Sequence, residues 1–496
     1  MVKRIAVENP VDPKILGDAL AFPTSKKVAK NRFMKAPLSE NLAKWDPTNA
    51  AISGAASDLH IVVTGNVMVD QMHLESPGNT IIAKELDLPH RREIWKSLAS
   101  KAKQHGTLII AQISHAGRQT ALIVNQHPFS SSEVQLKRDA YALIVNQHPF
   151  SSSDVQLKRD AYGREYGVPI ALTEEQIKTE IIEKFVYTSK VLYECGFDGV
   201  ELHGAHGYLI AQFLSRTTNK RTDKYGGSPQ NRARIVTEIY EAIRKEIPES
   251  TGFIVGIKLN SVEFQREGLT NEEAIQIAKE IDNAGFDFIE LSGGTYEAMG
   301  FSHKKKSTIA REAFFLEFAE KIKLAIKSAV VYLTGGFRTV PGMVKAVECK
   351  GTDGIGLGRP ITQDMDLPLK ILNGTVHSAI ESPFGDDLMS NGLACNCQMA
   401  QAGIFPYSPD KPLTDGVMDI TDEKTLKEFK RAQNEFLQNV IRKMIGKQFY
   451  HGIVPYRLNG QGKDFVIEAY GFEISLLLRT ALCAFLVYLK VQSYMC

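Results

Sequence analysis

Cysteine and net charge are both scarce in this chain. It has six cysteines among 496 residues, and 59 basic against 57 acidic side chains leave a formal net charge of +2. So few, scattered cysteines argue against a disulfide-stapled secreted domain and favour free thiols in a reducing, cytoplasmic compartment. A charge this close to zero gives no general electrostatic reason to expect a nucleic-acid partner.

Several familiar signatures are also missing. The one close cysteine pair, Cys395 and Cys397, has the spacing of neither a zinc knuckle nor a CxxC redox site. No GxGxxG turn follows an early apolar run, which argues against a doubly wound dinucleotide-binding sheet. What remains is an ordinary globular composition, 43% hydrophobic and 23% charged.

Long apolar runs are rare as well. Residues 1–8 lack the apolar core of a signal peptide. Residues 474–489 are mostly apolar, but Arg479 interrupts the run, which is shorter than the roughly 20 residues that span a membrane. We therefore expect no membrane span, although this tail leaves weak membrane association open. A helix docked on the body, or an unfolded tail, explains the composition equally well.

Apolar runs do alternate regularly with amphipathic stretches between residues 31 and 375. The apolar runs predict eight strands, at 32–38, 60–69, 107–115, 197–202, 253–260, 286–292, 330–335 and 353–357. Helix-period segments occur between them at 91–105, 173–195, 231–246, 271–284 and 314–327. Thr173 and Thr270 stand at N-cap positions, and Gly196, Gly285 and Gly351 stand where helices should end. This alternation favours an α/β fold in which a parallel sheet closes into a (β/α)8 TIM barrel.

Polar side chains and glycines gather where these strands end. Gly335-Gly336 and Gly358-Arg359 follow the last two strands, where this fold commonly binds phosphate. Backbone N–H groups can approach a phosphate where no Cβ intervenes, and Arg359 adds a bidentate cation. The sequence therefore predicts a phosphate site here rather than two unrelated turns.

The fourth strand leads into His203-Gly204-Ala205-His206-Gly207-Tyr208. Because side chains alternate along a strand, Glu201 and His203 should share one face of it. Imidazoles can hydrogen-bond a carbonyl or an anion, and a phenol keeps its proton at neutral pH and can act as a general acid. The two histidines lack the further ligands that a metal ion needs, so no metal site is predicted.

This stretch resembles the signature of the Old Yellow Enzyme family of FMN-dependent NADH:flavin oxidoreductases. The match continues through Phe213-Leu214-Ser215, Asn219, Arg221-Thr222-Asp223, Tyr225-Gly226-Gly227-Ser228 and Asn231-Arg232. The wider resemblance covers about residues 10–375 and is closest to barrels of the NADH oxidase type. The related 2,4-dienoyl-CoA reductases carry an iron–sulfur centre and dinucleotide domains, which this chain is expected to lack.

The resemblance implies contacts to the isoalloxazine ring by four residues at the first two strand ends: Pro37, Leu38, Ser39 and Gly65. Ser39 matches the family's Thr or Cys position beside the reactive edge of the flavin, and Gln112 matches a donor and acceptor to its pyrimidine edge. The phosphate of FMN would then lie at the two glycine-rich strand ends.

Lys258 stands where many relatives have arginine. A cation there would stabilise the negative charge that develops on the flavin as it is reduced. The alternative is a strand lysine that pairs with a carboxylate such as Glu201.

The resemblance also implies roles in catalysis. His203 and His206 would bind the carbonyl oxygen of a small substrate with an electron-poor double bond, and NADPH or NADH would be the electron donor. Hydride would pass from flavin N5 to the β-carbon, while Tyr208 protonates the α-carbon from the opposite face. Replacing Tyr208 by Phe should then spare flavin reduction and slow alkene reduction.

Residues 121–141 and 142–162 form a tandem repeat that differs only at Glu133 and Asp154. Two copies are too few for a solenoid, so a recent duplication or an artefact of gene prediction is the better interpretation. One copy should occupy the loop after the third strand and the other should bulge from it, since loop closure costs little extra for added length.

We expect three parts in the chain: an FMN-binding barrel over residues 1–375, which includes the duplicated loop 121–162; a C-terminal extension over 376–472 packed on the barrel, with a helix near 422–444; and an apolar tail over 473–496. The sequence is also compatible with a homo-oligomer.

Two other functions stay open on sequence alone. One is an inactive flavin-binding barrel, which would be yellow but not bleached by NADH or NADPH. The other is a non-flavin, phosphate-binding barrel such as an aldolase, for which Lys258 is the one plausible Schiff-base lysine.

Overall fold

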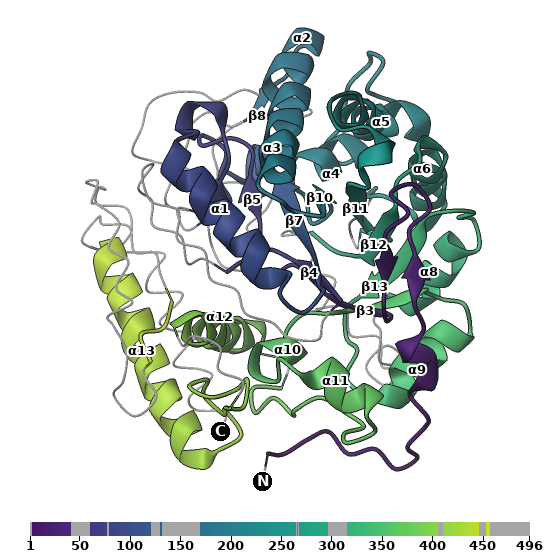
Figure 1. The fold of residues 1–496 in the computed structure, drawn as a ribbon. Helices are drawn as coiled ribbons and strands as arrows, with labels where there is room; N and C mark the ends of the chain where they lie inside the picture. Colours follow the sequence, from purple (N-terminus) through teal and green to yellow (C-terminus); the bar gives the residue numbers. More distant parts are fainter. Residues whose placement is uncertain are drawn as a thin grey trace.

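The computed structural model describes residues 2–40, 60–76, 79–120, 129–130, 169–263, 265, 267–295, 315–385, 387–404, 410–445 and 453–456. Among these residues, eight parallel strands form a closed ring in which each strand pairs with the next and β10 pairs back with β7 (Figure 1). The strands are β3 (Phe33–Lys35), β4 (Ile61–Val63), β7 (Leu108–Ser114), β10 (Gly199–Gly204), β11 (Ile254–Asn260), β12 (Phe288–Ser292), β13 (Val330–Thr334) and β14 (Gly354–Leu357). All eight predicted strands, and with them the (β/α)8 barrel, are confirmed.

Helices surround the ring (Figure 1). They are α1 (Pro89–Ala102), α2 (Glu174–Gln176) continued by the π-helical turn Ile177–Ile182 into α3 (Glu183–Glu194), α5 (Pro229–Glu246), α6 (Asn271–Ala284), α8 (Leu316–Lys323), α9 (Val340–Glu348) and α11 (Leu367–Leu372). Short helices α4 (Leu209–Leu214) and α10 (Pro360–Gln363) follow β10 and β14.

The predicted helix ends are mostly confirmed. Thr173 and Thr270 each form a capping box, and Gly285 ends α6 in the left-handed conformation at φ 101°. α9 ends at Glu348, close to the predicted stop at Gly351, whose N–H donates to the Ala346 carbonyl at 3.0 Å. Lys350 rather than Gly351 takes the left-handed conformation, at φ 57°, which costs an L-residue about 1–2 kcal/mol.

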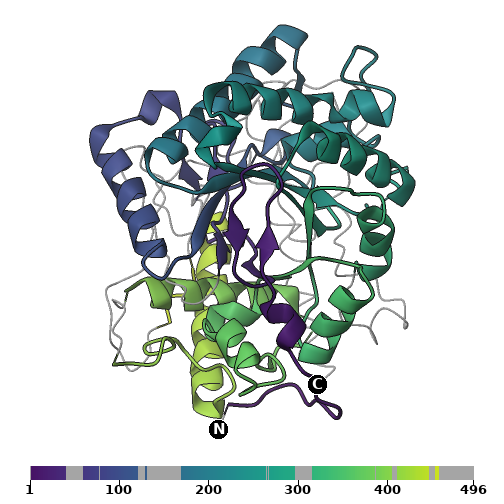
Figure 2. The ribbon, with the colours of Figure 1, turned by 45° about the vertical axis from the view of Figure 1, so that its right-hand side comes forward.

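The amino end of the barrel is filled by a hairpin, β1 (Leu20–Ala21) and β2 (Val28–Ala29) (Figure 2). Leu20 and Phe22 belong to one buried cluster with the inward-facing Phe288 and Tyr332. Glycine on a neighbouring strand makes room for these rings, since a Cβ on Gly256 would lie 2.2 Å from a Phe288 ring carbon. The hairpin and these side chains therefore close this end.

Two short strands extend the sheet at the opposite, carboxyl end. β5 (Val67–Met68) pairs with the last residues of β7, and β6 (Thr80–Ile81) pairs with β5. The predicted strand 60–69 is thus two strands, β4 and β5, which are interrupted around Gly65. The loop between β5 and β6 consequently lies at the rim where the site is expected.

The first copy of the repeat contributes one described element, β8 (Phe129–Ser130). It pairs in parallel with β9 (Ile170–Ala171), just before α2. The remainder of both copies, including the expected bulge, lies outside the described residues.

Beyond the barrel, α12 (Leu388–Ile404) and α13 (Glu423–Ile445) share a small core that includes Phe429 and Phe436 (Figure 1). The helix predicted near 422–444 corresponds to α13. Thr362 in α10 donates a hydrogen bond to Gln398 in α12 at 2.8 Å, which links the extension to the last barrel segment. The predicted boundary at residue 375 stays a prediction, and the tail at 473–496 lies outside the described residues.

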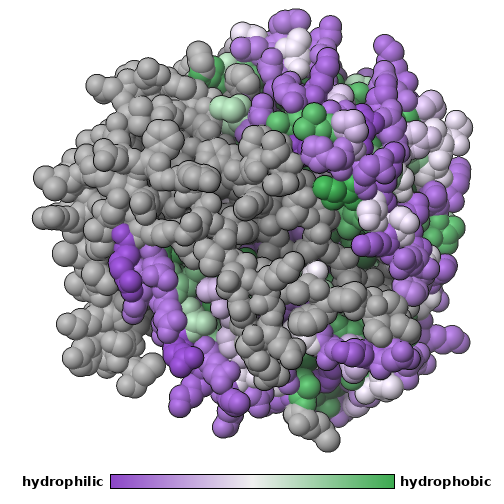
Figure 3. Space-filling view, turned by 60° about the vertical axis from the view of Figure 1, so that its left-hand side comes forward, coloured by the Kyte–Doolittle hydropathy of each residue, from purple (hydrophilic) through white to green (hydrophobic). Residues whose placement is uncertain are grey.

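The described surface is mainly polar on the face shown in Figure 3, where hydrophobic residues appear as small separate patches. Among the helices described, none combines the length and the apolar character needed to cross a membrane. The four described cysteines, Cys195, Cys349, Cys395 and Cys397, are free thiols.

Candidate active site

A cavity of about 270 Å³ opens at the carboxyl ends of the strands. It brings together all but one of the residues that the sequence predicted: Pro37, Leu38, Ser39, Gln112, His203, His206, Tyr208, Lys258, Gly335, Gly336, Gly358 and Arg359. Gly65 is the exception. A Cβ at Gly65 would stand 2.4 Å from the Leu38 carbonyl oxygen, so the glycine allows two backbone segments to approach closely behind the cavity wall.

One end of the cavity has the chemistry of a phosphate site. Gly335 and Gly336 both have positive φ, at 134° and 86°, and the cations Arg338 and Arg359 line the same wall. The Thr334 hydroxyl beside them is buried without a hydrogen-bond partner in the structure. Exposed backbone, two guanidinium groups and an unsatisfied hydroxyl together suit an anion that fills this end.

Four buried side chains lie along the middle of the cavity and beneath it. Gln112 donates to Glu201 at 2.6 Å, and Lys258 donates to Glu290 at 2.5 Å. Burial and the neighbouring Glu290 hold the pKa of Glu201 well above its usual range. The environment of Glu201 therefore favours its protonated form, and Glu290 is the carboxyl group that forms the ion pair with Lys258.

Lys258 thus forms an ion pair with a carboxylate, the alternative to a flavin contact, but its partner is Glu290 rather than Glu201. The strand register places Lys258 directly beside Glu290 of β12, whereas Glu201 of β10 lies opposite Gly256. Lys258 still lines the cavity, so the ion pair does not remove it from the site.

The other end of the cavity holds the two imidazoles and the phenol. His203 Nε2 lies 3.2 Å from His206 Nδ1, and His206 Nε2 lies 3.0 Å from the Ser292 hydroxyl. The ring of Tyr208 lies 4.3 Å from that of His203. His206 takes a left-handed backbone conformation at φ 58°, and this tight turn lets residues 203, 206 and 208 face one cavity.

Both histidines are neutral in this environment. Burial, with smaller effects of His206 and Lys258, holds the pKa of His203 well below its usual range. Burial and Lys258 lower the pKa of His206 to about 3. Each ring therefore has one N–H donor and one acceptor nitrogen.

Sequence reasoning missed three residues of this end: Asn66, Glu75 and Ser292. Asn66 Oδ1 lies 2.9 Å from His203 Nδ1, and Asn66 Nδ2 donates to Glu75 at 2.8 Å. Ser292 ends a predicted strand, so its position could have suggested it, whereas Asn66 falls inside the predicted strand 60–69 and was hidden by the missed interruption between β4 and β5. Glu75 lies in the β5–β6 loop and carries no sequence signal.

A second polar cluster, formed by Asp70, His73 and His115, has the composition of a metal site and is fully buried. Its geometry argues against coordination. The two rings stack at 4.3 Å and 26°, so their in-plane lone pairs do not converge on one ion. Lys184 also donates to Asp70 at 2.5 Å, so this carboxylate already has a cationic partner. We interpret this cluster as structural support for the rim.

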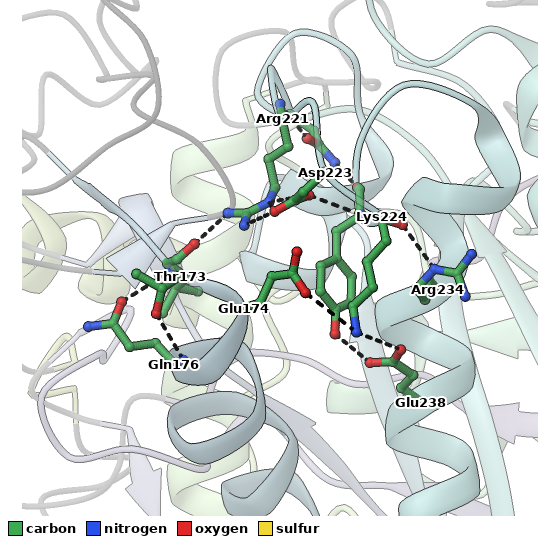
Figure 4. A network of polar contacts seen from close by, with 11 residues as sticks. Thr173, Glu174, Gln176, Arg221, Asp223, Lys224, Arg234 and Glu238 are labelled. Carbon is green, nitrogen blue, oxygen red and sulfur yellow. Dashed lines mark hydrogen bonds and ion pairs between the residues drawn. The ribbon is translucent and has the colours of Figure 1, made fainter.

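Several other residues of the family-like stretch have structural roles (Figure 4). Arg221 binds the Asp223 carboxylate and donates to the Leu172 carbonyl at 2.6 Å, just before α2. The Tyr225 hydroxyl donates to Glu238 of α5 at 2.6 Å. These contacts tie the loop after α4 to the start of α2 and to α5, so the loop supports the site without lining it.

The cavity as a whole fits FMN. Its lining supplies the groups that this cofactor needs: glycine-rich strand ends with arginines for the phosphate, an amide and an ammonium group for the pyrimidine edge, and imidazoles with a phenol for a substrate at the reactive face. Bound there, FMN would be held by Arg359 and the glycine-rich strand ends and contacted by Gln112 and Lys258.

Comparisons with known proteins agree with this geometry. The model of the NADH:flavin oxidoreductase / NADH oxidase family matches residues 25–377. NADH-dependent flavin oxidoreductase nadA of Aspergillus parasiticus is 40% identical over 430 residues, covering 83% of this chain and 90% of that protein. NADH-dependent flavin oxidoreductase iccE of Talaromyces variabilis is 35% identical over 357 residues, covering 69% and 83%.

Solved structures support the fold. The Old Yellow Enzyme homologue from Zymomonas mobilis superposes with a TM-score of 0.58 at 21% identity, over 81% of this chain and 99% of that one. Morphinone reductase in complex with tetrahydroNAD gives 0.55 at 22% identity, over 74% and 92%. The chain therefore belongs to the NADH:flavin oxidoreductase / NADH oxidase family, and it is an FMN-dependent NAD(P)H oxidoreductase.

Proposed function

We propose that this enzyme reduces small molecules that carry an electron-poor double bond, with NADH or NADPH as the electron donor. One observation carries the proposal: a single cavity holds a hydrogen-bonding pair, His203 and His206, and an adjacent phenol, Tyr208, at the end opposite the phosphate-like loops. Such an arrangement can bind one oxygen of an alkene and deliver a proton to a carbon near it.

Each residue has a defined task in this reaction. His203 and His206 orient the substrate oxygen, and Tyr208 supplies a proton to the α-carbon. Lys258, which is paired with Glu290 and nearly buried, places positive charge beside the cofactor site. Bound FMN would supply hydride transfer between the nicotinamide and the alkene. The names of the relatives nadA and iccE favour NADH as the donor.

The first experiment is an absorbance spectrum of the purified, FMN-loaded protein before and after anaerobic NADH, followed by α,β-unsaturated aldehydes, ketones and imides. We expect bleaching by NADH and reoxidation by at least one of these alkenes. A yellow protein that NADH does not bleach would instead support an inactive flavin-binding barrel.

Tyr208→Phe separates the two half-reactions. Flavin reduction by NADH should keep its rate, whereas alkene reduction should slow by about 10²- to 10⁴-fold, the usual contribution of a general acid. The matched control is Tyr193→Phe, at a half-exposed tyrosine on α3. Equal slowing of both half-reactions by Tyr208→Phe would contradict the assignment of Tyr208 as the proton donor.

A further inference from the structure

The two arginines at the phosphate-like end of the cavity belong to segments that the C-terminal extension contacts. Arg359 comes directly before α10, and Arg338 follows β13. α12 of the extension lies beside α10, outside the ring of strands (Figure 1). Pro360 of α10 lines the cavity, so α12 packs on an element of the cavity wall.

α10 is a single helical turn, which is too short to hold its own geometry, and Gln398 of α12 anchors it from outside. Gln398 is 1% exposed. Its side chain accepts a hydrogen bond from Thr362 Oγ1 at 2.8 Å and donates one to Gln363 Oε1 at 2.9 Å. It also donates to the Met418 carbonyl oxygen at 3.3 Å. A buried amide that uses its oxygen and both of its N–H groups fixes the position of this turn relative to the extension.

The anchored turn carries Arg359 directly. Thr362 Oγ1 lies 3.0 Å from the Arg359 carbonyl oxygen, so the anchored hydroxyl contacts the backbone of the arginine itself. Cys395 lies three residues before Gln398, on the same face of α12. Burial raises the pKa of its thiol, and a hydrogen bond with Thr362 and the charges of Arg359 and Arg338 partly offset that rise. This face of α12 therefore lies close to both guanidinium groups.

Arg338 is held by the chain that leads into the extension. The Ala379 N–H donates to the Arg338 carbonyl oxygen at 2.7 Å, and the Val340 N–H donates to the His377 carbonyl oxygen at 2.9 Å. The segment after the barrel thus pairs with the loop after β13 through an antiparallel bridge. The backbone of each arginine is therefore fixed by residues that follow the barrel.

We propose that Gln398 is a positioning residue of the cofactor site: it holds α10, and through α10 the Arg359 guanidinium, where the phosphate of FMN binds. A bidentate contact between a guanidinium and a phosphate depends on orientation as well as distance, so it needs a rigid support. The extension thereby becomes part of the FMN site, although none of its described residues lines the cavity. The proposal concerns cofactor binding alone and does not depend on an alkene as the substrate.

Gln398→Met tests the proposal, because methionine has a similar size but cannot replace the amide hydrogen bonds. The full-length protein, freed of flavin, is titrated with FMN and with riboflavin, which has the same ring without the phosphate. The ratio of Kd for riboflavin to Kd for FMN measures what the phosphate contributes. Kd for FMN should rise by about 10-fold, as expected when a hydrogen bond to a charged group is lost, while Kd for riboflavin should stay within about twofold.

Gln401→Met is the matched control. Gln401 lies on the same helix and is 3% exposed; its amide accepts from the Met418 N–H at 2.9 Å and donates to the Tyr456 carbonyl oxygen at 3.2 Å. Both partners belong to the extension, so this variant removes an equally buried amide without releasing α10. It should leave the ratio unchanged. A fall as large as that in Gln398→Met would reveal a general effect on packing and would overturn the proposal.

Arg359→Ala shows whether Gln398 acts through the arginine. This variant should itself lower the ratio, and adding Gln398→Met should lower it no further. The same additional loss in both backgrounds would contradict a role through Arg359.

Thr362→Val removes the hydroxyl on the α10 side of the anchor and decides the question if Gln398→Met does not fold. It should also lower the ratio of the two dissociation constants. A wild-type ratio in Gln398→Met, or in Thr362→Val when that variant alone folds, would overturn the proposal. If FMN binds as expected but no alkene is reduced, only the proposed function fails.

Discussion

Deleting residues 142–162, the second copy of the repeat, should leave the barrel intact and make it slightly more stable. β8 comes from the first copy and pairs directly with β9, so the intervening chain leaves Ser130 and returns at Ile170. The deletion shortens that stretch from 39 to 18 residues and keeps the junction between tyrosine and Gly163. Loop-closure entropy then favours the shorter chain by about 0.7 kcal/mol. For a protein of this size, that corresponds to a rise in Tm of about 1–2 °C.

Thermal unfolding, FMN binding and NADH-dependent flavin reduction measure the outcome. Deletion of residues 121–141 is a matched control, because the product differs from the first deletion only by Asp for Glu. Deletion of both copies, residues 121–162, removes the sequence of β8 and should lower stability. If removing 142–162 abolishes folding or FMN binding, the second copy has a structural role, and the reasoning from β8 is refuted.

Three further predictions concern stability. Gly256→Ala should lower the free energy of unfolding by about 1–3 kcal/mol, because the new Cβ would meet the Phe288 ring at 2.2 Å. Adding Phe288→Leu should recover part of that loss in a double-mutant cycle, and strictly additive effects would argue against the clash. Glu201→Gln should cost less than Glu290→Gln. Burial already disfavours the charged form of Glu201, whereas the second substitution removes the partner of a buried lysine; denaturation curves in the reverse order would contradict this. The free energy of unfolding should fall as the pH drops from about 6.5 towards 3, because His206 binds a proton at a higher pH in the unfolded chain than in the folded one. His206→Asn should make this pH dependence of stability less steep in acid titrations, and an unaltered dependence would contradict the prediction.

The strands of the barrel were predictable because both of their faces are buried, so each one is an almost continuous apolar run. The interruption near Gly65 was not, since it depends on the close approach of the Leu38 carbonyl in the segment that follows β3. The start of α6 followed from its N-cap box, whereas the glycine after α9 gave the end of that helix only to within three residues.

Most of the candidate site could be read from strand ends, because parallel strands bring their carboxyl ends to one rim. The partner of Lys258 could not, because Glu201 and Glu290 are both carboxylates on neighbouring strands and the choice depends on register. The contact between Asn66 and Glu75 was out of reach for a similar reason, because it follows only from how the loop between β5 and β6 folds back on the strand ends.

The hairpin that closes the amino end of the barrel has a consequence for the kinetics. With Leu20 and Phe22 packed against Phe288 and Tyr332, nicotinamide and oxidising substrate have to share the mouth at the carboxyl end. On the proposed function both would bind over the same face of the flavin, so the oxidised pyridine nucleotide would have to leave before the acceptor binds. Initial velocities should accordingly follow a ping-pong pattern, with parallel lines in double-reciprocal plots and mutual inhibition at high concentrations of either reactant.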